Sequence, residues 1–301
     1  MISQYPIQNL NYSRQQSGEE SYVIHMLTSS PRSFLTNAYL IETESALVAV
    51  DTFMIVPDAL ALRELLNSIG KPLIAIIITH GHPDHYNGTA TLLEDFKDVP
   101  VISTQGITDC IRDSIDAKEV KWKPFFADEW PSEKVLPNQW VKDDETLTLD
   151  GLDYYFRDLG AAESSSDLYF TLGPNKSAVF VGDVVFNQMH GFMNDGHSLQ
   201  WLAVLKQLAG ELKEVSTLFT GHGQPGNPVE LILAQIKYVS VYQREVAALA
   251  KGARQLTREQ KIKLEERMCK AFPHYQLNGF IQAGADSVAN ELALKLSALS
   301  N

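Results

Sequence analysis

The chain has 301 residues, of which 45% are hydrophobic, enough to bury the core of one large domain or two small ones. Its formal net charge of −12 disfavours a nucleic-acid partner, because nucleic-acid binding usually requires a basic surface, and leaves a small-molecule substrate as the expected partner. No apolar run reaches the roughly 18 residues of a membrane span, so no membrane partner is expected. The polar N-terminal stretch lacks the apolar segment of a signal peptide, which favours a cytoplasmic location; export with a removed signal stays an alternative.

Strands and helices alternate in the first part of the chain. Residues 1–20 are polar and are expected to be irregular. Two apolar runs, 34–42 and 46–52, are joined by a short polar link, which predicts a hairpin. Residues 57–69 carry apolar side chains at helical spacing, and Gly70 predicts the end of that helix. This alternation indicates an α/β fold.

A β-branched run, residues 74–79, ends in the sequence HGHPDH, which begins at His80. The run predicts a short buried strand, because it is apolar on both faces. Residues two apart at the end of a strand point the same way, so His80 and His82 can bind one metal ion. Asp84 and His85 follow a proline that forces a turn, so they point elsewhere, and this arrangement suits two adjacent ions. A surface loop rich in histidine is the less favoured alternative, because three of the eight histidines lie here at ordered spacing.

The pattern after this motif is first α/β and then helical. Helices are predicted at 87–96 and 106–115. Residues 117–138 are rich in aromatics and prolines, and these aromatic rings either line an apolar substrate pocket or anchor the segment to the core. We expect a domain of residues 1–228 followed by a helical extension of residues 229–301, which packs on that domain or forms a homodimer through its helices.

The HGHPDH stretch resembles the H-x-H-x-D-H motif of the metallo-β-lactamase superfamily of hydrolases, and the resemblance covers most of residues 34–226. It implies an α/β fold that is a four-layer αββα sandwich of two mixed β-sheets with outer helices. It places Asp51 beneath the metal site as a structural carboxylate. Asp183, in a Gly-Asp pair after an apolar strand, matches the family's bridging aspartate, and His222, between two glycines, matches its last histidine.

One position departs from the family pattern. Residues 160–167 carry Glu163 where the family usually has a third histidine for the first ion. Glutamate is a legitimate zinc ligand, and its added negative charge favours Fe or Mn or weakens the binding of zinc. The alternative is that the first site is lost and that one metal remains on Asp84, His85 and His222.

The resemblance implies a centre of two zinc ions, with Fe or Mn as alternatives. The ions would lower the pKa of a bound water to about 7, and the resulting hydroxide would attack a carbonyl or phosphoryl centre. The implied ligands are His80, His82 and Glu163 for the first ion, Asp84, His85 and His222 for the second, and Asp183 as the bridge.

Three residues near these ligands are candidates for catalytic roles. Asp84 would orient the nucleophile and carry its proton to the leaving group. Tyr86 would donate its hydroxyl to the substrate and His190 would be a secondary proton carrier, although packing is the simpler role for each. The expected function is hydrolysis of an ester, lactone, thioester or β-lactam-type acyl bond. The alternatives are hydrolysis of a small phosphoester, or a non-catalytic binding protein in which Glu163 has reduced metal chemistry.

Overall fold

The computed structural model describes residues 11–16, 22–96, 98–173 and 175–299. The chain divides into two compact units. Unit 1 consists of Met1–Asp158 and Leu168–Phe180, and unit 2 consists of Leu159–Asp167 and Val181–Asn301. The division at residue 228 stays a prediction.

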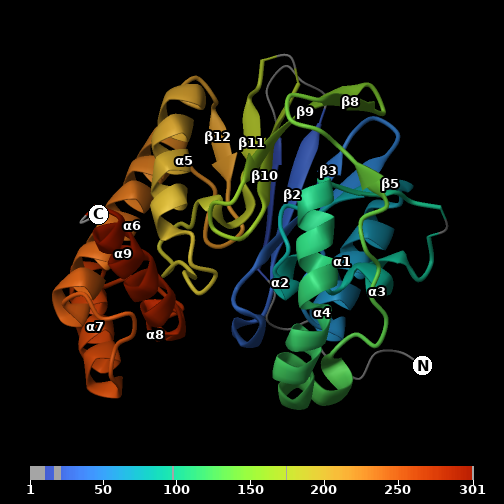
Figure 1. Ribbon diagram of the computed structural model, residues 1–301. Coiled ribbons are helices and arrows are strands. Elements are labelled where there is room, and N and C mark those ends of the chain that lie inside the picture. The colour runs from blue at the N-terminus through green and yellow to red at the C-terminus, as the bar shows by residue number, and fades with distance from the viewer. Residues whose placement is uncertain (1–10, 17–21, 97, 174, 300–301) are drawn as a thin grey trace. The chain divides into compact units, whose positions relative to one another are not determined.

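A seven-stranded mixed sheet is the centre of unit 1 (Figure 1). Its strands, in spatial order, are β1 (Asn11–Gln16), β2 (Val23–Thr28), β3 (Asn37–Glu42), β4 (Leu47–Val50), β5 (Leu73–Ile77), β6 (Val101–Ser103) and β7 (Gln139–Trp140). The first four strands pair antiparallel, and β4 to β7 pair parallel. Because β4 and β5 are parallel neighbours, the segments that follow them start from the same edge of the sheet.

Two predictions for this sheet are confirmed and one is wrong in part. The hairpin is β3 and β4, and the strand before the histidines is β5, whose residues are buried except for one intermediate position. Residues 11–16 form strand β1 instead of an irregular segment, because the edge of β2 supplies backbone hydrogen-bond partners whatever the polarity of the side chains. The remaining residues of the polar N-terminal stretch lie outside the described part of the chain.

The first helix of unit 1 follows the prediction, whereas the later helices differ from it in their bounds. Helix α1 (Val56–Ile69) ends at Gly70, which has a left-handed φ of 77° as predicted. The helix expected at 87–96 is the shorter α3 (Thr89–Leu93), and a separate short helix that was not predicted, α2 (Pro83–Tyr86), precedes it. The break lies at Gly88, where an added Cβ would be 2.1 Å from the Thr52 carbonyl oxygen.

Helix α4 (Gln105–Phe126) is longer than predicted and includes the first part of the aromatic segment. The hydroxyl of Thr104 caps its start by accepting from the Ile107 N–H. Phe126 and Trp130 are buried against Met54 and Ile55, with Phe34 and Trp122 packed beside them. Phe126 and Trp130 therefore anchor the aromatic segment to the core, which was one of the two alternatives for these rings.

Unit 1 also contains four strands of a second sheet, in the spatial order β11-β10-β9-β8. Their bounds are β8 (Thr146–Leu149), β9 (Leu152–Gly160), β10 (Asp167–Leu172) and β11 (Ala178–Phe180). The Phe170 ring stacks on Phe180 at 4.9 Å, and Phe180 meets Tyr39 of β3 edge-on at 5.1 Å. These rings place the two sheets against one core.

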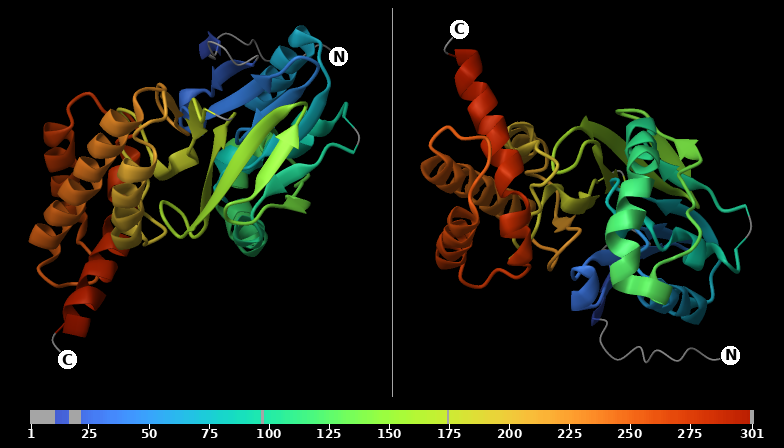
Figure 2. Two further views of the ribbon diagram at one scale, coloured as in Figure 1. Left: turned by 90° about the horizontal axis from the view of Figure 1, so that it is seen from above. Right: turned by 60° about the horizontal axis from the view of Figure 1, so that its bottom comes forward.

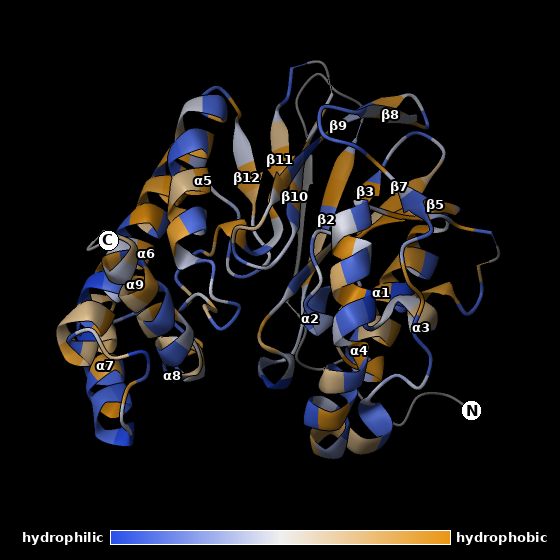
Figure 3. Cartoon of the chain, viewed as in Figure 1, coloured by the Kyte–Doolittle hydropathy of each residue, from blue (hydrophilic) through white to orange (hydrophobic). Residues whose placement is uncertain are grey.

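Unit 2 is mainly helical, with α6 at its centre (Figure 2). Its elements are the short η3 (Gly182–Val184), α5 (Ser198–Glu211), β12 (Thr217–Phe219), α6 (Pro228–Ala250), α7 (Arg258–Ala271), α8 (Gly279–Ala283) and α9 (Ala285–Leu299). Thr257 and Gln260 form the capping box of α7. Hydrophobic and polar residues alternate along α5, as in a helix with one buried face (Figure 3). No helix in the described ranges has the length and apolar character that a membrane crossing requires.

Candidate metal centre

The carboxylate of Asp51 organises the histidine motif in unit 1. Asp51 follows β4, and its Oδ1 and Oδ2 accept hydrogen bonds from the Thr79 N–H at 2.9 Å and the Thr79 hydroxyl at 2.8 Å. His85 Nδ1 lies 2.7 Å from Asp51 Oδ2. Because the ionised carboxylate accepts the proton of Nδ1, the Nε2 of His85 is left as the metal-binding atom. The predicted position of Asp51 beneath the histidines matches this arrangement.

Burial controls the protonation of Asp51. The side chain is 2% exposed, and loss of solvent raises its pKa above the ordinary value. The His85 and Thr79 hydrogen bonds act in the opposite direction. Asp51 and His85 therefore form a buried pair in which the protonation state of one group affects that of the other.

Two pairs of donor atoms in unit 1 have the separation of ligands to one ion. His80 Nε2 lies 3.1 Å from His82 Nδ1, and Asp84 Oδ2 lies 3.5 Å from His85 Nε2. Two ligands at about 2.1 Å from a tetrahedral zinc ion lie roughly 3.4 Å apart. Both separations are therefore compatible with binding to one cation, and the role of these residues as ligands stays a prediction.

Sequence reasoning missed the residue that holds Asp84. The hydroxyl of Thr36 donates to Asp84 Oδ2 at 2.9 Å, and the Thr36 N–H donates to Ser29 Oγ at 2.9 Å. Thr36 lies in a turn rich in serine and threonine just before β3, and that composition indicates a turn without indicating which hydroxyl reaches the motif. Asp84 is 7% exposed, so this bond fixes one oxygen of a nearly buried carboxylate.

Glu163 lies on a loop of unit 2 that is built around Asp167. Asp167 Oδ2 accepts from the Ala162 N–H at 3.2 Å and from the Ser164 N–H at 2.9 Å, on either side of Glu163. Glu163 is 2% exposed, and one of its carboxylate oxygens lies within 4.8 Å of an oxygen of Asp183. The loop therefore presents Glu163 as an interior carboxylate beside Asp183, and its predicted role as a ligand stays a prediction.

Asp183 and His222 are held together by neighbouring backbone segments of unit 2. The Gly221 N–H donates to the Gly182 carbonyl at 2.7 Å, and Asp183 Oδ2 lies 3.2 Å from His222 Nε2. The Phe186 ring stacks on the His222 ring at 5.1 Å and 6°. This third donor pair again has the separation of two ligands to one ion.

The helical extension reaches the segment that follows Asp183, which sequence reasoning did not anticipate. On one side of this segment the Asn187 N–H donates to the His222 carbonyl at 3.0 Å. On the other side the Gln276 N–H donates to the Gln188 carbonyl at 3.0 Å, and the His190 N–H donates to the Gln276 carbonyl at 2.8 Å. Residues 187–190 are thus held between His222 and the connection of α7 to α8.

Tyr86 and His190 both lie in the interior. The Tyr86 hydroxyl is buried without a hydrogen-bond partner in the described residues, and burial raises its pKa, so it stays protonated and can donate a hydrogen bond. His190 Nδ1 lies 3.1 Å from the Tyr238 hydroxyl, and burial lowers the pKa of His190 to about 4. Neutral His190 packs in unit 2 at 0% exposure. Both predicted catalytic roles remain predictions.

The donor chemistry of both units fits a metal centre. Every proposed ligand is buried, and the set contains only imidazole and carboxylate groups. These groups suit zinc, iron and manganese. Each unit therefore contains part of the predicted ligand set.

Comparison with known proteins identifies the family. The sequence model of the metallo-beta-lactamase superfamily matches residues 32–222. The chain belongs to this superfamily. A metallo-beta-lactamase from Pontibacter korlensis aligns with 76% of the chain and 99% of its own length at a TM-score of 0.60 and 16% identity. VMB-1 aligns with 76% of the chain and 97% of its own length at a TM-score of 0.58 and 16% identity.

These structural likenesses show the fold of the metallo-β-lactamase superfamily. The predicted αββα class with two mixed sheets, outer helices and a C-terminal helical extension is confirmed. Family members typically bind metal ions, in agreement with the donors found here.

Two curated relatives match shorter parts of the chain. Uncharacterized protein YobT of Bacillus subtilis (strain 168) is 31% identical over 83 residues, which are 27% of this chain and 35% of YobT. Hydroxyacylglutathione hydrolase of Prochlorococcus marinus (strain MIT 9301) is 29% identical over 136 residues, 45% of this chain and 46% of the relative. The chain thus spans less than half the length of either relative.

Proposed function

We propose that this member of the metallo-β-lactamase superfamily is a metal-dependent hydrolase. The observation that carries the proposal is the three donor pairs, 3.1 to 3.5 Å apart, in a region that the family model spans. Zinc is the proposed metal, with iron or manganese as alternatives because of the carboxylate of Glu163. The proposed ligands are His80, His82 and Glu163 for one ion, Asp84, His85 and His222 for the other, and Asp183 as the bridge.

An acyl bond is the proposed target: an ester, lactone, thioester or β-lactam. The name of the relative from Prochlorococcus marinus states hydrolysis of hydroxyacylglutathione, and the structural neighbours are named for hydrolysis of β-lactams. Both are acyl compounds. The net charge of −12 also disfavours a polyanionic substrate such as a nucleic acid.

The residues of unit 1 have defined tasks in such a reaction. When bound, the ions would act as Lewis acids toward the substrate and lower the pKa of water. Asp84 accepts the proton of the attacking water and passes it to the leaving group, while the Thr36 hydroxyl fixes its Oδ2. Asp51 keeps His85 in one tautomer and one orientation. Tyr86, kept protonated by burial, would donate a hydrogen bond.

A panel of p-nitrophenyl esters tests the reaction class. Acetate, butyrate, phosphate and phosphodiester compounds are each assayed with Zn²⁺, Mn²⁺ or Fe²⁺ and after treatment with a chelator. We expect turnover of the acyl esters, loss of turnover on chelation, and near-complete loss in His82→Ala and in Asp183→Ala. Turnover of the phosphoryl esters alone would assign the chain to phosphoester hydrolysis, and full activity in both variants would reject the metal mechanism.

Substitutions of Glu163 test whether the chain is an enzyme or a non-catalytic binding protein. If Glu163 is a ligand, Glu163→Ala removes an anionic donor, and we expect lower metal content and lower activity than in Glu163→His, which restores an imidazole. If Glu163 has instead disabled the centre, only the histidine variant will bind metal and turn over ester. Equal metal content in the wild-type protein and in both variants would show that the Glu163 side chain does not bind the ion.

We also propose a homodimer formed through the extension. Exposed apolar side chains on α9 support it, because Leu294 and Leu296 are 48% and 57% exposed. Sedimentation at several protein concentrations checks the oligomeric state. A cytoplasmic location and the lack of a nucleic-acid partner stay predictions.

A further inference from the structure

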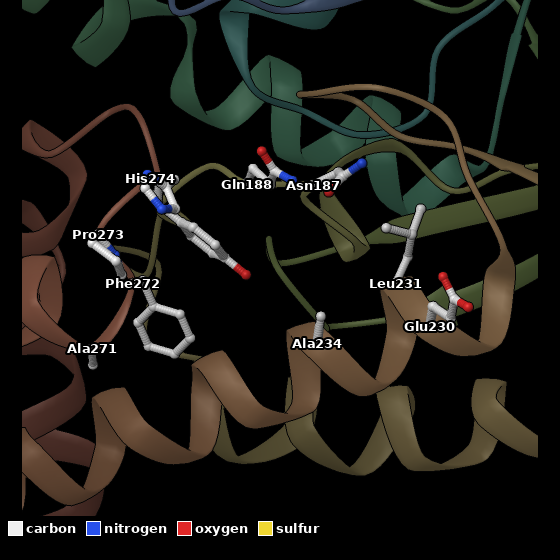
Figure 4. Close-up of a pocket in the computed structure, with 10 residues that line it drawn as sticks. Asn187, Gln188, Glu230, Leu231, Ala234, Ala271, Phe272, Pro273 and His274 are labelled. Atoms are coloured by element: carbon white, nitrogen blue, oxygen red, sulfur yellow. The ribbon is translucent and has the colours of Figure 1, made fainter.

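A pocket in unit 2 lies between α6 and the connection of α7 to α8 (Figure 4). Its volume is about 350 Å³, at the lower end of the range for small-molecule sites. Asn187 and Gln188 lie together on one side of it, opposite Ala234 of α6 (Figure 4). None of the predicted catalytic or metal-binding residues lines this pocket.

One part of the pocket wall is apolar and aromatic. Leu231 and Ala234 are successive pocket positions on α6, one helical turn apart. Phe272 is 6% exposed, and its ring lies 5.0 Å from Tyr238 and 4.9 Å from Tyr275. Because neighbouring rings fix Phe272, this wall is a formed surface that an apolar group can cover.

The polar part of the wall is negatively charged. Glu230, an exposed residue in the first turn of α6, is the one carboxylate among the ten lining residues, which include one histidine, His274, and no lysine or arginine. Within the described residues, the Glu230 carboxylate makes no ion pair, and neither it nor the Tyr275 hydroxyl has a hydrogen-bond partner. The pocket therefore combines an unneutralised carboxylate and an available hydroxyl with aromatic rings.

We propose that this pocket binds a small organic cation, an amine with an aromatic or aliphatic body. The ammonium group would pair with Glu230 and be attracted electrostatically to the ring faces of Phe272 or Tyr275, and the body would cover Leu231 and Ala234. A carboxylate or phosphate ligand would face Glu230 without a lysine or arginine to balance it. A small organic cation is therefore the class of ligand that fits the charge of this pocket.

The pocket shares a segment with the proposed metal centre. Asn187 lines the pocket with its side chain, and its N–H donates to the carbonyl of His222 at 3.0 Å. Binding in the pocket does not require metal or turnover, so the cation proposal can fail or hold independently of the hydrolase proposal.

Calorimetric titration of the purified full chain tests the proposal. The probes are phenethylamine, 3-phenylpropan-1-ol and 3-phenylpropionate, which share a phenyl body and differ in charge. We expect phenethylamine to bind at least tenfold more tightly than the alcohol, and the carboxylate not to bind. Equal affinity for the three probes, or no heat of binding with the amine, would overturn the proposal.

Two variants locate the binding. Glu230→Gln keeps the shape and removes the charge, and we expect about tenfold weaker amine binding with unchanged binding of the alcohol. Ala234→Phe fills the cavity, and we expect it to remove binding of both. Glu214→Gln is the matched control, because Glu214 is exposed and lies outside the pocket, and it should bind as wild type. Wild-type amine affinity in Glu230→Gln and Ala234→Phe, each with an unchanged circular dichroism spectrum, would contradict the assignment.

Discussion

Asp51 has a backbone φ of 58°, a left-handed value that aspartate and asparagine adopt more readily than other side chains. Asparagine can therefore replace it with little change in backbone strain. Its two oxygens accept three hydrogen bonds from Thr79 and His85. An amide has only one acceptor oxygen, so Asp51→Asn must lose part of this set and leave His85 less well oriented.

We predict that Asp51→Asn binds metal about 10- to 100-fold more weakly, the usual effect of removing a partner of a ligating histidine. Competition with a chromophoric chelator measures the affinity. Asp150→Asn is the control. Asp150 also accepts hydrogen bonds from neighbouring hydroxyls, which lower its pKa to about 2, but it lies in a surface turn. Unchanged metal affinity in Asp51→Asn would show that Asp51 does not support the metal centre.

His190 makes the stability of the chain depend on pH. Its pKa is about 4 when folded and near 6.5 when exposed, so between these values the unfolded chain binds a proton that the folded chain does not. The free energy of unfolding therefore rises with pH across this window, and the stability is lost as pH falls from 6.5 toward 4.

We predict that His190→Gln, which cannot take up this proton, has a shallower dependence of unfolding free energy on pH. Urea denaturation of both proteins at steps between about pH 4 and 6.5 gives the two curves. The difference between the curves isolates His190 from the other titrating groups. Parallel curves would mean that His190 is already solvated in the folded protein.

At the scale of elements, the turn after β12 allows two segments of unit 2 to come into contact. Gly223 has a φ of 90°, and an added Cβ would lie 2.0 Å from the carbonyl oxygen of Asn187. Only glycine permits both the conformation and the contact. His222 is the adjacent residue, so its position depends on this contact.

We predict that Gly223→Ala lowers the free energy of unfolding by about 2 kcal/mol or more, through backbone strain and overpacking. Metal affinity should fall as well, because His222 is displaced. Gly210→Ala is the matched control: Gly210 is an exposed residue of α5 with nothing within 4 Å of an added Cβ, so alanine should stabilise by about 0.5–1 kcal/mol. Thermal and urea unfolding measure both variants, and equal stability in the two would contradict the proposed contact.

Periodicity predicted the elements whose structure depends on local sequence. Helix α1 with its terminal Gly70 and the β3–β4 hairpin belong to this group. The break at Gly88 depends on a contact with Thr52, which is distant in the sequence, and strand β1 depends on backbone pairing with β2, the next strand along the chain. Periodicity contains no information about such contacts, which explains why these two features were missed.

At the scale of the whole molecule, the same distinction applies to the candidate site. The spacing of His80, His82, Asp84 and His85 predicted the candidate ligands of unit 1 because a strand end fixes their directions. Thr36 and Asp167, which hold Asp84 and the Glu163 loop, have no such spacing and became visible only in the structure. The part played by the extension was also missed, because backbone bonds such as those of Gln276 leave no side-chain pattern.

Metal content per chain, measured by mass spectrometry on purified protein, tests the central claim that the candidate ligands of the chain bind metal ions. We predict about two ions per wild-type chain, and loss of metal from His82→Ala in unit 1 and equally from Asp183→Ala in unit 2. A wild-type chain that contains no metal and binds none when Zn²⁺, Mn²⁺ or Fe²⁺ is supplied would contradict the claim.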